Sequence, residues 1–414
     1  MSAAILSIGT ELTRGEIVNT NASWLAESLT ALGMEVTAME VVADHRATIV
    51  ETLHRLSAGH TLLVCTGGLG PTTDDITSEC VAEVLGVPMQ RDDASLVAIK
   101  QRMARFGRSM APSNEKQADF PRGATVLANR KGTAPGFHVQ VGHANAFFLP
   151  GVPREMKTMF EEHIAPEVPP LVGESLHQVR LKTFGMTESA VNDKLAGIEG
   201  AHDVVIAYRA HFPEIEVKVL ARAARKGDAE SRARAAANVV LERLGPDVVY
   251  AEGDVTFAQA LGALLLERNM KLATAESCTG GLVGEILTER GGSSEFYAGG
   301  IVAYENSVKE QLLGVPAPML AQYGAVSPEV ARAMAEGALR VVGANVAVAF
   351  TGIAGPGGGT PEKPVGTVCY AVATRDGTVD RQMVFPGSRT QVRQLAAFAG
   401  LALVRSVLRR GLDA

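Results

Sequence analysis

A serine and a lysine in the last third of the chain could form the nucleophile and base of an acyl-transfer site. Ser277 lies in the string TAESCTGG, between a strand-like apolar run and the helix-patterned residues 282–288. A turn between a strand and a helix exposes such a hydroxyl beside free helix-start N–H groups, which can stabilise an oxyanion. We expect Lys309 in the first turn of a helix capped by Asn306. There, burial and the helix dipole both lower the pKa of its ammonium group toward that of a base.

Other interpretations of this turn stay open. A serine before an apolar run is commonly only a helix cap, and Cys278 is either the nucleophile itself or a small buried residue. A second glycine-dense turn, residues 351–359, follows the strand-like residues 346–350 and favours a ligand site. It lacks the Gly-Lys-Ser/Thr ending of a P-loop, so ATP is not implied.

A third glycine turn, residues 66–77, follows a strand-like run early in the chain and opens a helix. Three of its glycines let a ligand approach the backbone, and the helix start behind them favours phosphate oxygens: Gly67, Gly68 and Gly70. Asp74 and Asp75 could hold a divalent ion against those oxygens. A plain N-cap on an ordinary turn is the competing interpretation.

The elements around these turns predict α/β architecture in three segments: 1–168, 171–250 and 254–414. In the first segment, strand-like runs alternate with helical stretches, which indicates a mostly parallel sheet covered by helices on both faces. The strands are expected at 4–8, 36–42 and 61–65, and the helices at 23–32, 48–56 and 77–85. The second segment predicts a small α+β unit of βαββα order, and the third alternates strands and helices again.

Composition excludes several classes of protein. The chain has 414 residues, 46% hydrophobic content and a formal charge of −6, which suits a globular protein of two or three domains and no general nucleic-acid binding. Its four cysteines form no CxxC pair, which argues against a zinc site and a disulfide framework. Neither a signal peptide nor a membrane-length apolar run occurs, so we expect a cytoplasmic protein with no membrane partner.

The motifs of the third segment resemble the carboxy-terminal domain of the CinA (competence/damage-inducible) family. They are TAESCTGG, 300–306 with Lys309, 324–327, 351–356 and 363–366. The resemblance implies a nicotinamide mononucleotide amidohydrolase that needs no cofactor, with Ser277 and Lys309 as its catalytic dyad and Tyr304 beside them. It further implies a substrate site formed by Thr279, Gly280, Thr351, Gly352 and an arginine, either Arg389 or Arg393.

The first segment is similar to the amino-terminal domain of the same family, through residues 9–21, GGLGPTTDD, 114–118, Asn129 with 132–136, and 149–155. This resemblance implies a molybdopterin-binding-like fold and a metal-dependent ADP-ribose pyrophosphatase. It assigns catalysis to Asp44 and Asp75, nucleotide binding to Asn21, Thr133 and the three glycines, and metal binding to Asp74, Asp75 and Glu155. The metal is expected to be Mg, Mn, Co or Ni, with K as a second ion.

Asp74 departs from the molybdopterin-binding relatives, which often carry a basic residue there, so molybdopterin transfer is not expected. An extra carboxylate suits a metal–pyrophosphate site better than a bare anion site. In the family the middle segment is a KH-like unit, but residues 183–189 contain no GxxG loop, which argues against RNA binding.

Together these features predict a homodimeric enzyme of pyridine-nucleotide recycling that acts on nicotinamide mononucleotide and ADP-ribose. Two alternatives belong to other classes. In one, the amino-terminal domain is a non-catalytic nucleotide or pterin-binding module. In the other, the protein is a scaffold in DNA uptake or repair.

Overall fold

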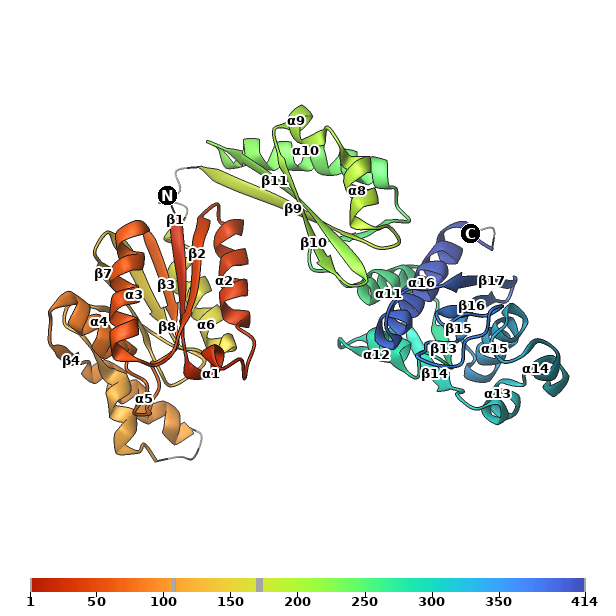
Figure 1. The fold of residues 1–414 in the computed structure, drawn as a ribbon, viewed down its shortest axis with the longest axis horizontal. Coiled ribbons are helices and arrows are strands. Elements are labelled where there is room, and N and C mark those ends of the chain that lie inside the picture. The colour runs from red at the N-terminus through yellow and green to blue at the C-terminus, as the bar shows by residue number, and fades with distance from the viewer. Residues whose placement is uncertain (1, 106, 108, 169–173, 413–414) are drawn as a thin grey trace. The chain divides into compact units, whose positions relative to one another are not determined.

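The computed structural model describes residues 2–105, 107, 109–168 and 174–412. The chain forms two compact units, Met1–Gln178 with Ala221–Ser231 and Val179–Leu220 with Arg232–Ala414. Within these units lie three main sheets, each with its own helices (Figure 1). No helix in the described ranges is long and apolar enough to cross a membrane.

The first sheet has six strands in the order β2-β1-β3-β8-β7-β6. Its first four strands run parallel, whereas β7 and β6 are antiparallel to their neighbours. The strands are β1 (Ser2–Ile8), β2 (Glu35–Val42), β3 (Leu62–Thr66), β6 (Thr125–Leu127), β7 (Gly136–Val141) and β8 (Ala144–Leu149). The carboxyl ends of β1, β3 and β8 therefore meet at one edge, where ligands bind in sheets of this type.

Helices cover both faces of this sheet, as the alternation of elements predicts. In β1, Ala4 and Leu6 pack in one apolar core with helix α3, while Ala3 and Ile5 pack in another with helix α2. Strands buried on both faces explain the near-continuous apolar runs in the sequence. The helices are α1 (Thr10–Thr13), α2 (Thr20–Ala31), α3 (Arg46–Gly59), α4 (Thr77–Leu85) and α6 (Pro153–Met159), which continues as η2 (Phe160–Ile164).

A small subdomain interrupts this pattern between α4 and β6. A two-stranded antiparallel sheet pairs β4 with β5, and a helix and a 3-10 helix lie between them in sequence. Its elements are β4 (Met89–Arg91), α5 (Asp93–Arg105), η1 (Pro112–Ala118) and β5 (Asp119–Pro121). Helix α5 supplies one wall of the second cavity described below, and Gln117 of η1 lines the first.

The middle segment has the predicted βαββα order, with a short extra helix and a fourth strand that completes its sheet. The strand order is β10-β11-β9-β12, and both β10–β11 and β9–β12 are antiparallel pairs. The elements are β9 (Ser175–Thr183), α8 (Glu188–Leu195), α9 (Ile198–His202), β10 (Val205–His211), β11 (Glu214–Ala223), α10 (Lys226–Leu244) and β12 (Val249–Glu252).

The last sheet has five strands in the order β14-β13-β15-β16-β17, of which the first three are parallel. β15 is buried on both faces: Val348 and Phe350 pack with α11 and α16, and Ala347 and Ala349 pack with α15. The strands are β13 (Leu272–Glu276), β14 (Tyr297–Val302), β15 (Val346–Gly352), β16 (Thr367–Thr374) and β17 (Gly377–Val384).

The predicted alternation of strands and helices holds only in part here: helices follow β13, β14 and β17, whereas β15, β16 and β17 succeed one another as antiparallel neighbours with no helix between them. The elements are α11 (Phe257–Glu267), α12 (Leu282–Thr288), η3 (Ser293–Glu295), α13 (Asn306–Leu313), α14 (Ala317–Tyr323), α15 (Pro328–Val342) and α16 (Arg389–Arg410). The α/β fold class predicted for the chain is therefore confirmed. Because β13, β14 and β15 are parallel, the turns that follow them share one edge of the sheet.

Candidate active sites

Ser277 is the first residue beyond β13, the strand that lies between β14 and β15. Its N–H donates to the carbonyl of Phe350 at 3.0 Å, and its own carbonyl accepts from Gly280 N at 3.1 Å, which closes a tight turn. Gly281 then starts α12 with φ 95°, a left-handed conformation that favours glycine. The serine is 9% exposed. The strand, turn and helix arrangement around it is the predicted one.

The N–H groups at the start of α12 are not free, and on this point the sequence-based expectation is wrong. The carboxylate of Glu276, 2% exposed, takes them: Oε2 accepts from Gly281 N and Val283 N at 2.9 and 3.1 Å, and Oε1 accepts from Gly284 N at 2.9 Å. Leu282 N donates to the Thr279 carbonyl. The N–H groups at the start of α12 therefore bind the protein's own Glu276 carboxylate, and they do not form an oxyanion hole for a substrate.

Cys278, the alternative nucleophile, lies in the apolar core. It is 6% exposed and packs in the same core as Val283 and Leu287. Burial raises the pKa of its thiol to about 12, and the nearby Glu276 carboxylate acts in the same direction. A thiol with such a pKa is almost wholly protonated at neutral pH and is a poor nucleophile. The structure therefore favours the serine over the cysteine.

Lys309 is almost completely buried, with 1% of its surface exposed. Its Nζ donates to the carbonyls of Ala303 and Tyr304, both at 2.9 Å. Burial lowers the pKa of this ammonium group, and the charge of Glu305 opposes the shift. The helix α13 begins one residue earlier than predicted: Glu305 is its N-cap and Asn306 its first residue, since Glu305 has extended backbone angles and no side chain caps the helix.

The backbone brings Ser277 and Lys309 to the same edge of the sheet. Ala303 N donates to the Glu276 carbonyl at 2.7 Å, so the two carbonyls that hold Lys309 Nζ follow β14 directly beside the end of β13. Among the hydrogen bonds of the described residues, none joins Ser277 Oγ to Lys309 Nζ. Such bonds are often long without substrate and tighten only when it binds.

The two arginines predicted for the substrate site make different contacts near this edge of the sheet. Arg389 is exposed, and its guanidinium donates to the Tyr304 hydroxyl at 3.1 Å and to the Gly355 carbonyl at 2.8 Å. Arg393 instead directs Nε and Nη2 at the Thr279 carbonyl, at 3.2 and 2.6 Å. The first arginine can meet a ligand, whereas the second supports the turn that carries Ser277.

The remaining predicted residues here are largely internal. Thr351 is 1% exposed and donates its hydroxyl to the Ala325 carbonyl at 2.6 Å. Gly352 ends β15. Thr279 is fully buried, and its hydroxyl has no hydrogen-bond partner among the described residues; Gly280 follows it with φ 59°. These residues shape the edge of the sheet, and the hydroxyl of Thr351 is already used by the protein backbone.

A cavity of about 460 Å³ lies at the carboxyl edge of the first sheet. Every residue predicted for the amino-terminal site lines it: Asn21, Asp44, Gly67, Gly68, Gly70, Asp74, Asp75, Thr133 and Glu155. The cavity is also lined by residues that were not predicted, among them Glu11, Gln117 and the apolar side chains of Ile17, Val18 and Val152. All five of these residues lie within the matching segments 9–21, 114–118 and 149–155, and that position was a signal by which they could have been found.

The glycines of the 66–77 turn have a packing role that sequence alone does not reveal. A Cβ on Gly67 (φ 101°) would lie 2.0 Å from the Ile8 carbonyl oxygen, and one on Gly68 (φ 66°) would lie 2.1 Å from Thr77 Oγ1. Thr77 itself donates its hydroxyl to the Gly67 carbonyl and its N–H to the Gly68 carbonyl. The turn is thus fixed against β1 and α4, whether or not a ligand is bound.

Two carboxylates converge on one hydroxyl in this turn. Thr72 Oγ1 makes short hydrogen bonds to both Asp74 and Asp75, although a hydroxyl has one proton and can donate to only one of them at a time. Thr72 N also donates to Asp75 at 2.8 Å. The hydrogen bond from Thr72 lowers the pKa of Asp74, and the nearby ammonium group of Lys116 acts in the same direction.

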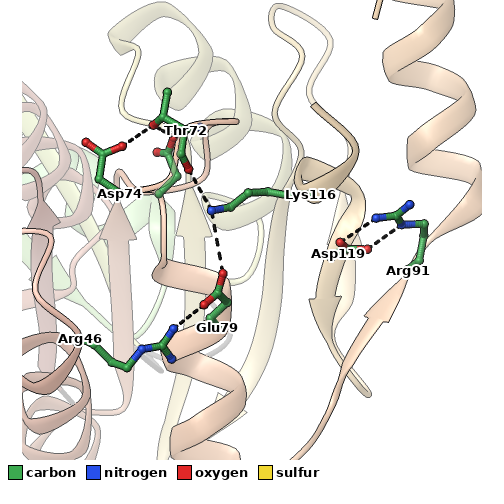
Figure 2. A network of polar contacts seen from close by, with 8 residues as sticks. Arg46, Thr72, Asp74, Glu79, Arg91, Lys116 and Asp119 are labelled. Carbon is green, nitrogen blue, oxygen red and sulfur yellow. Dashed lines mark hydrogen bonds and ion pairs between the residues drawn. The ribbon is translucent and has the colours of Figure 1, made fainter. Parts of the chain in front are cut away.

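A polar network holds the turn in place (Figure 2). Lys116 of η1 donates to the Thr72 carbonyl at 2.9 Å and lies 3.9 Å from Glu79 of α4. Glu79 in turn pairs with Arg46 of α3. The small subdomain and two helices therefore fix the loop that carries Asp74 and Asp75, and nothing in the local sequence pattern predicts this role for Lys116.

The other predicted carboxylates are engaged elsewhere. Asp44 Oδ2 accepts from the N–H and the hydroxyl of Thr10 at 2.7 and 2.9 Å, and Glu155 accepts from Asn129 at 2.7 Å. Within the part of the chain that the structure describes, no three His, Cys, Asp or Glu residues are gathered to hold a metal ion. Asp74, Asp75 and Glu155 line the same cavity but are not gathered closely enough to form a three-carboxylate metal site among the described residues.

Asp74 and Asp75 alone still fit a magnesium-type ion. Such an ion is commonly held by one or two carboxylates and takes its remaining ligands from water and substrate phosphates. The two carboxylates repel each other across the Thr72 hydroxyl, and a cation between them would relieve that repulsion.

Comparisons with known proteins match this architecture. Three family models match in order: a probable molybdopterin binding domain over residues 4–170, the damage-inducible protein CinA KH domain over 178–250 and the CinA C-terminal domain over 254–408. A CinA-like protein of Anaeromyxobacter dehalogenans is 45% identical over 416 residues, which cover 99% of this chain and 100% of that protein.

Two further similarities concern Geobacter and Agrobacterium proteins. A CinA-like protein of Geobacter sulfurreducens is 42% identical over 410 residues, 98% of each chain. A crystal structure of a competence/damage inducible protein from Agrobacterium tumefaciens is 41% identical, with a TM-score of 0.36, and covers 37% of this chain and 94% of that one. From the three domain matches and the full-length relatives, the chain belongs to the CinA family.

Proposed function

We propose that the carboxy-terminal domain hydrolyses the amide of nicotinamide mononucleotide to the acid and ammonia. One observation carries this proposal: a buried lysine with a lowered pKa is held by two carbonyls at the sheet edge where Ser277 is placed on a tight turn. Nucleophilic attack by a serine needs an adjacent base, and a desolvated lysine can serve as one at neutral pH.

The proposed reaction has two steps, formation of an acyl-serine on Ser277 and hydrolysis of that ester. In the first, Ser277 Oγ attacks the carboxamide carbon while neutral Lys309 takes the hydroxyl proton. The carbon–nitrogen bond then breaks, the proton passes from Lys309 to the leaving nitrogen, and ammonia departs. In the second, water cleaves the acyl-serine ester and Lys309 takes and returns one proton. The net reaction consumes one water and restores both side chains.

An exposed arginine near this site can bind the phosphate of the substrate and so orient it. Arg389 and Tyr304 are exposed and bonded to each other at the rim of this site. A guanidinium in such a place can pair with the phosphate of the mononucleotide through charge-assisted hydrogen bonds. Arg393 directs two of its N–H donors to the Thr279 carbonyl, so it is less available to bind the phosphate.

Ammonia release from nicotinamide mononucleotide by the full chain tests the proposal. Ser277→Ala should abolish release, and Cys278→Ala, the matched variant at the neighbouring position, should keep most of it. Activity lost in the cysteine variant and kept in the serine variant would assign the chemistry to the thiol. A wild-type chain without amidase turnover would favour the scaffold alternative.

We also propose that the amino-terminal domain hydrolyses ADP-ribose at its pyrophosphate. The specific support is the pair Asp74 and Asp75, converging on Thr72 at the edge of a 460 Å³ cavity. When bound by this pair, a divalent cation would neutralise charge that develops on the phosphate oxygens. Water attacks one phosphorus atom, one phosphorus–oxygen bond breaks, and AMP and ribose 5-phosphate leave.

Asp75→Asn separates catalysis from binding in this cavity. The variant should lose ADP-ribose hydrolysis in the presence of magnesium, manganese, cobalt or nickel, while ammonia release by the other domain is unchanged. Chelation of metal in the wild-type chain should have the same selective effect. If the wild-type chain binds ADP-ribose but cleaves it with none of these ions, with or without potassium, the domain is a binding module.

A further inference from the structure

A second cavity, of about 570 Å³, lies in the first unit between helix α5 and the segment 126–135. Its size falls within the range of small-molecule sites. The predicted active-site residues do not account for it: apart from Thr133, none of them lines this cavity.

The rim of this cavity is cationic. Arg102, Arg105 and Arg130 line it, and Asp92 is the one carboxylate among the described lining residues. Asp92 Oδ2 already accepts from Ser95 N at 2.7 Å at the start of α5, so it is occupied by the helix. The balance of charge therefore favours an anionic ligand.

The three arginines differ in availability. Arg102 is anchored, because its guanidinium donates to the carbonyls of Gly132 and Arg130. Arg130 is 76% exposed in its side chain, with one weak ion pair to Glu162 at 3.5 Å. Arg105 is exposed and has no ion pair or side-chain hydrogen bond among the described residues. Two guanidinium groups can thus turn toward a phosphate, the anion whose geometry suits arginine best.

The floor of the cavity is apolar. It is formed by small and aliphatic side chains from both walls: Ala94, Ala98, Ile99, Val126 and Pro135. An apolar surface beside arginine side chains fits a ligand with an aromatic base at one end and a phosphate at the other. Inorganic phosphate alone would leave the floor unused.

The wall between the two cavities is rigid. Asn129 Oδ1 accepts from Lys131 N and Gly132 N at 2.9 and 2.8 Å, and its Nδ2 donates to the Ala134 carbonyl at 2.8 Å and to Glu155. Thr133 lines both cavities. The second cavity is therefore a separate compartment that shares one wall with the first.

We propose that the second cavity binds a nucleoside monophosphate, with its phosphate on Arg105 and Arg130 and its base on the apolar floor. This site is independent of whether the first cavity is catalytic. Nucleotide binding here requires no catalysis, so failure of ADP-ribose hydrolysis in the first cavity would leave it unaffected.

Calorimetric titration of the full chain with AMP, in the presence of a chelator, tests it. The Arg105→Ala, Arg130→Ala double variant should raise the Kd for AMP at least tenfold, because two charge-assisted hydrogen bonds to phosphate are lost. Arg122→Ala, an exposed arginine outside the cavity, is the matched control and should leave the Kd unchanged. The exposed positions of the substituted arginines keep folding intact, which the unfolding temperature of each variant verifies.

Two further probes identify the ligand class and the cavity. Adenosine and inorganic phosphate should each bind at least tenfold more weakly than AMP; phosphate binding as tightly as AMP would overturn the nucleotide assignment. Saturating ADP-ribose should leave a site for AMP in the wild-type chain. An unchanged AMP Kd in the double variant, or full displacement of AMP by ADP-ribose, would place AMP in the first cavity and overturn the proposal.

Discussion

Replacing Glu276 by glutamine should destabilise the carboxy-terminal domain strongly. The carboxylate accepts three N–H groups of Gly281, Val283 and Gly284 in a site that is 2% exposed. A glutamine amide has one accepting oxygen, and its NH₂ group would face a buried N–H, which costs about 1–3 kcal/mol. The two bonds that remain lose their charge, at about 1 kcal/mol each. The expected loss of unfolding free energy is therefore about 3–5 kcal/mol.

Thermal unfolding followed by circular dichroism measures this loss. For a domain of this size, about 3–5 kcal/mol corresponds to a fall in Tm of roughly 6–20 °C. The single tryptophan, Trp24, packs edge-on against Phe160 in the first unit, whereas Glu276 lies in the second unit. The unfolding transition seen by tryptophan fluorescence therefore reports on the first unit and should be unchanged. Glu285→Gln, an exposed glutamate in the first turn of the same helix, is the matched control.

The same variant should also reduce kcat for amide hydrolysis more than it raises KM. Ser277 directly follows Glu276 on the turn, so loosening the turn misplaces the attacking oxygen. A Tm within about 2 °C of wild type would correspond to less than about 1 kcal/mol, and would refute the magnitude assigned to the three bonds. An unchanged kcat at a temperature where the variant is folded would refute the positioning role.

Two further predictions concern the amidase. Lys309 can accept a proton only when it is neutral, and burial lowers its pKa. The rate of amide hydrolysis should therefore rise with pH through that lowered pKa and level off below the ordinary lysine range. Lys309→Met should cut kcat about 10²- to 10⁴-fold and remove this rise. A pH profile that is unchanged in the methionine variant would exclude this lysine as the base. Arg389→Ala should raise KM for nicotinamide mononucleotide about 10- to 100-fold with little change in kcat, whereas Arg393→Ala, which frees the Thr279 carbonyl, should lower kcat and Tm. Equal KM effects in both variants would contradict the division of roles between the two arginines.

The sequence predicted the frame of the fold well, because hydrophobic periodicity decides where strands and helices lie. The helix at 77–85 was placed at its observed bounds, and the strands of the parallel sheets lay within a few residues of their observed ends. The resemblance to the CinA family predicted the residues of the amino-terminal site, and the carboxyl ends of parallel strands bring such residues to one edge of a sheet. The residues of the amino-terminal site accordingly line one cavity.

What the sequence could not predict depends on partners that are distant in the chain or on fine backbone geometry. Lys116 reaches the 66–77 turn only because the β4–β5 pair folds its subdomain back onto α4. The role of Glu276 depends on where three N–H groups point after a left-handed glycine, which no pattern of apolar residues specifies. Its acidic type within TAESCTGG, a few residues before a helix start, was nevertheless a usable signal.

The tight packing of Gly67 against Ile8 affects how mutational data on this family should be interpreted. Any side chain at this position would overlap a backbone carbonyl oxygen, which cannot move aside without distorting β1. In a saturation library scored by growth or by abundance, position 67 would therefore tolerate no replacement even in a protein that never meets a nucleotide. Intolerance at Asp74, whose side chain is exposed and overlaps no backbone atom, would be the more informative signal in a library scored by growth, because packing does not forbid a replacement there.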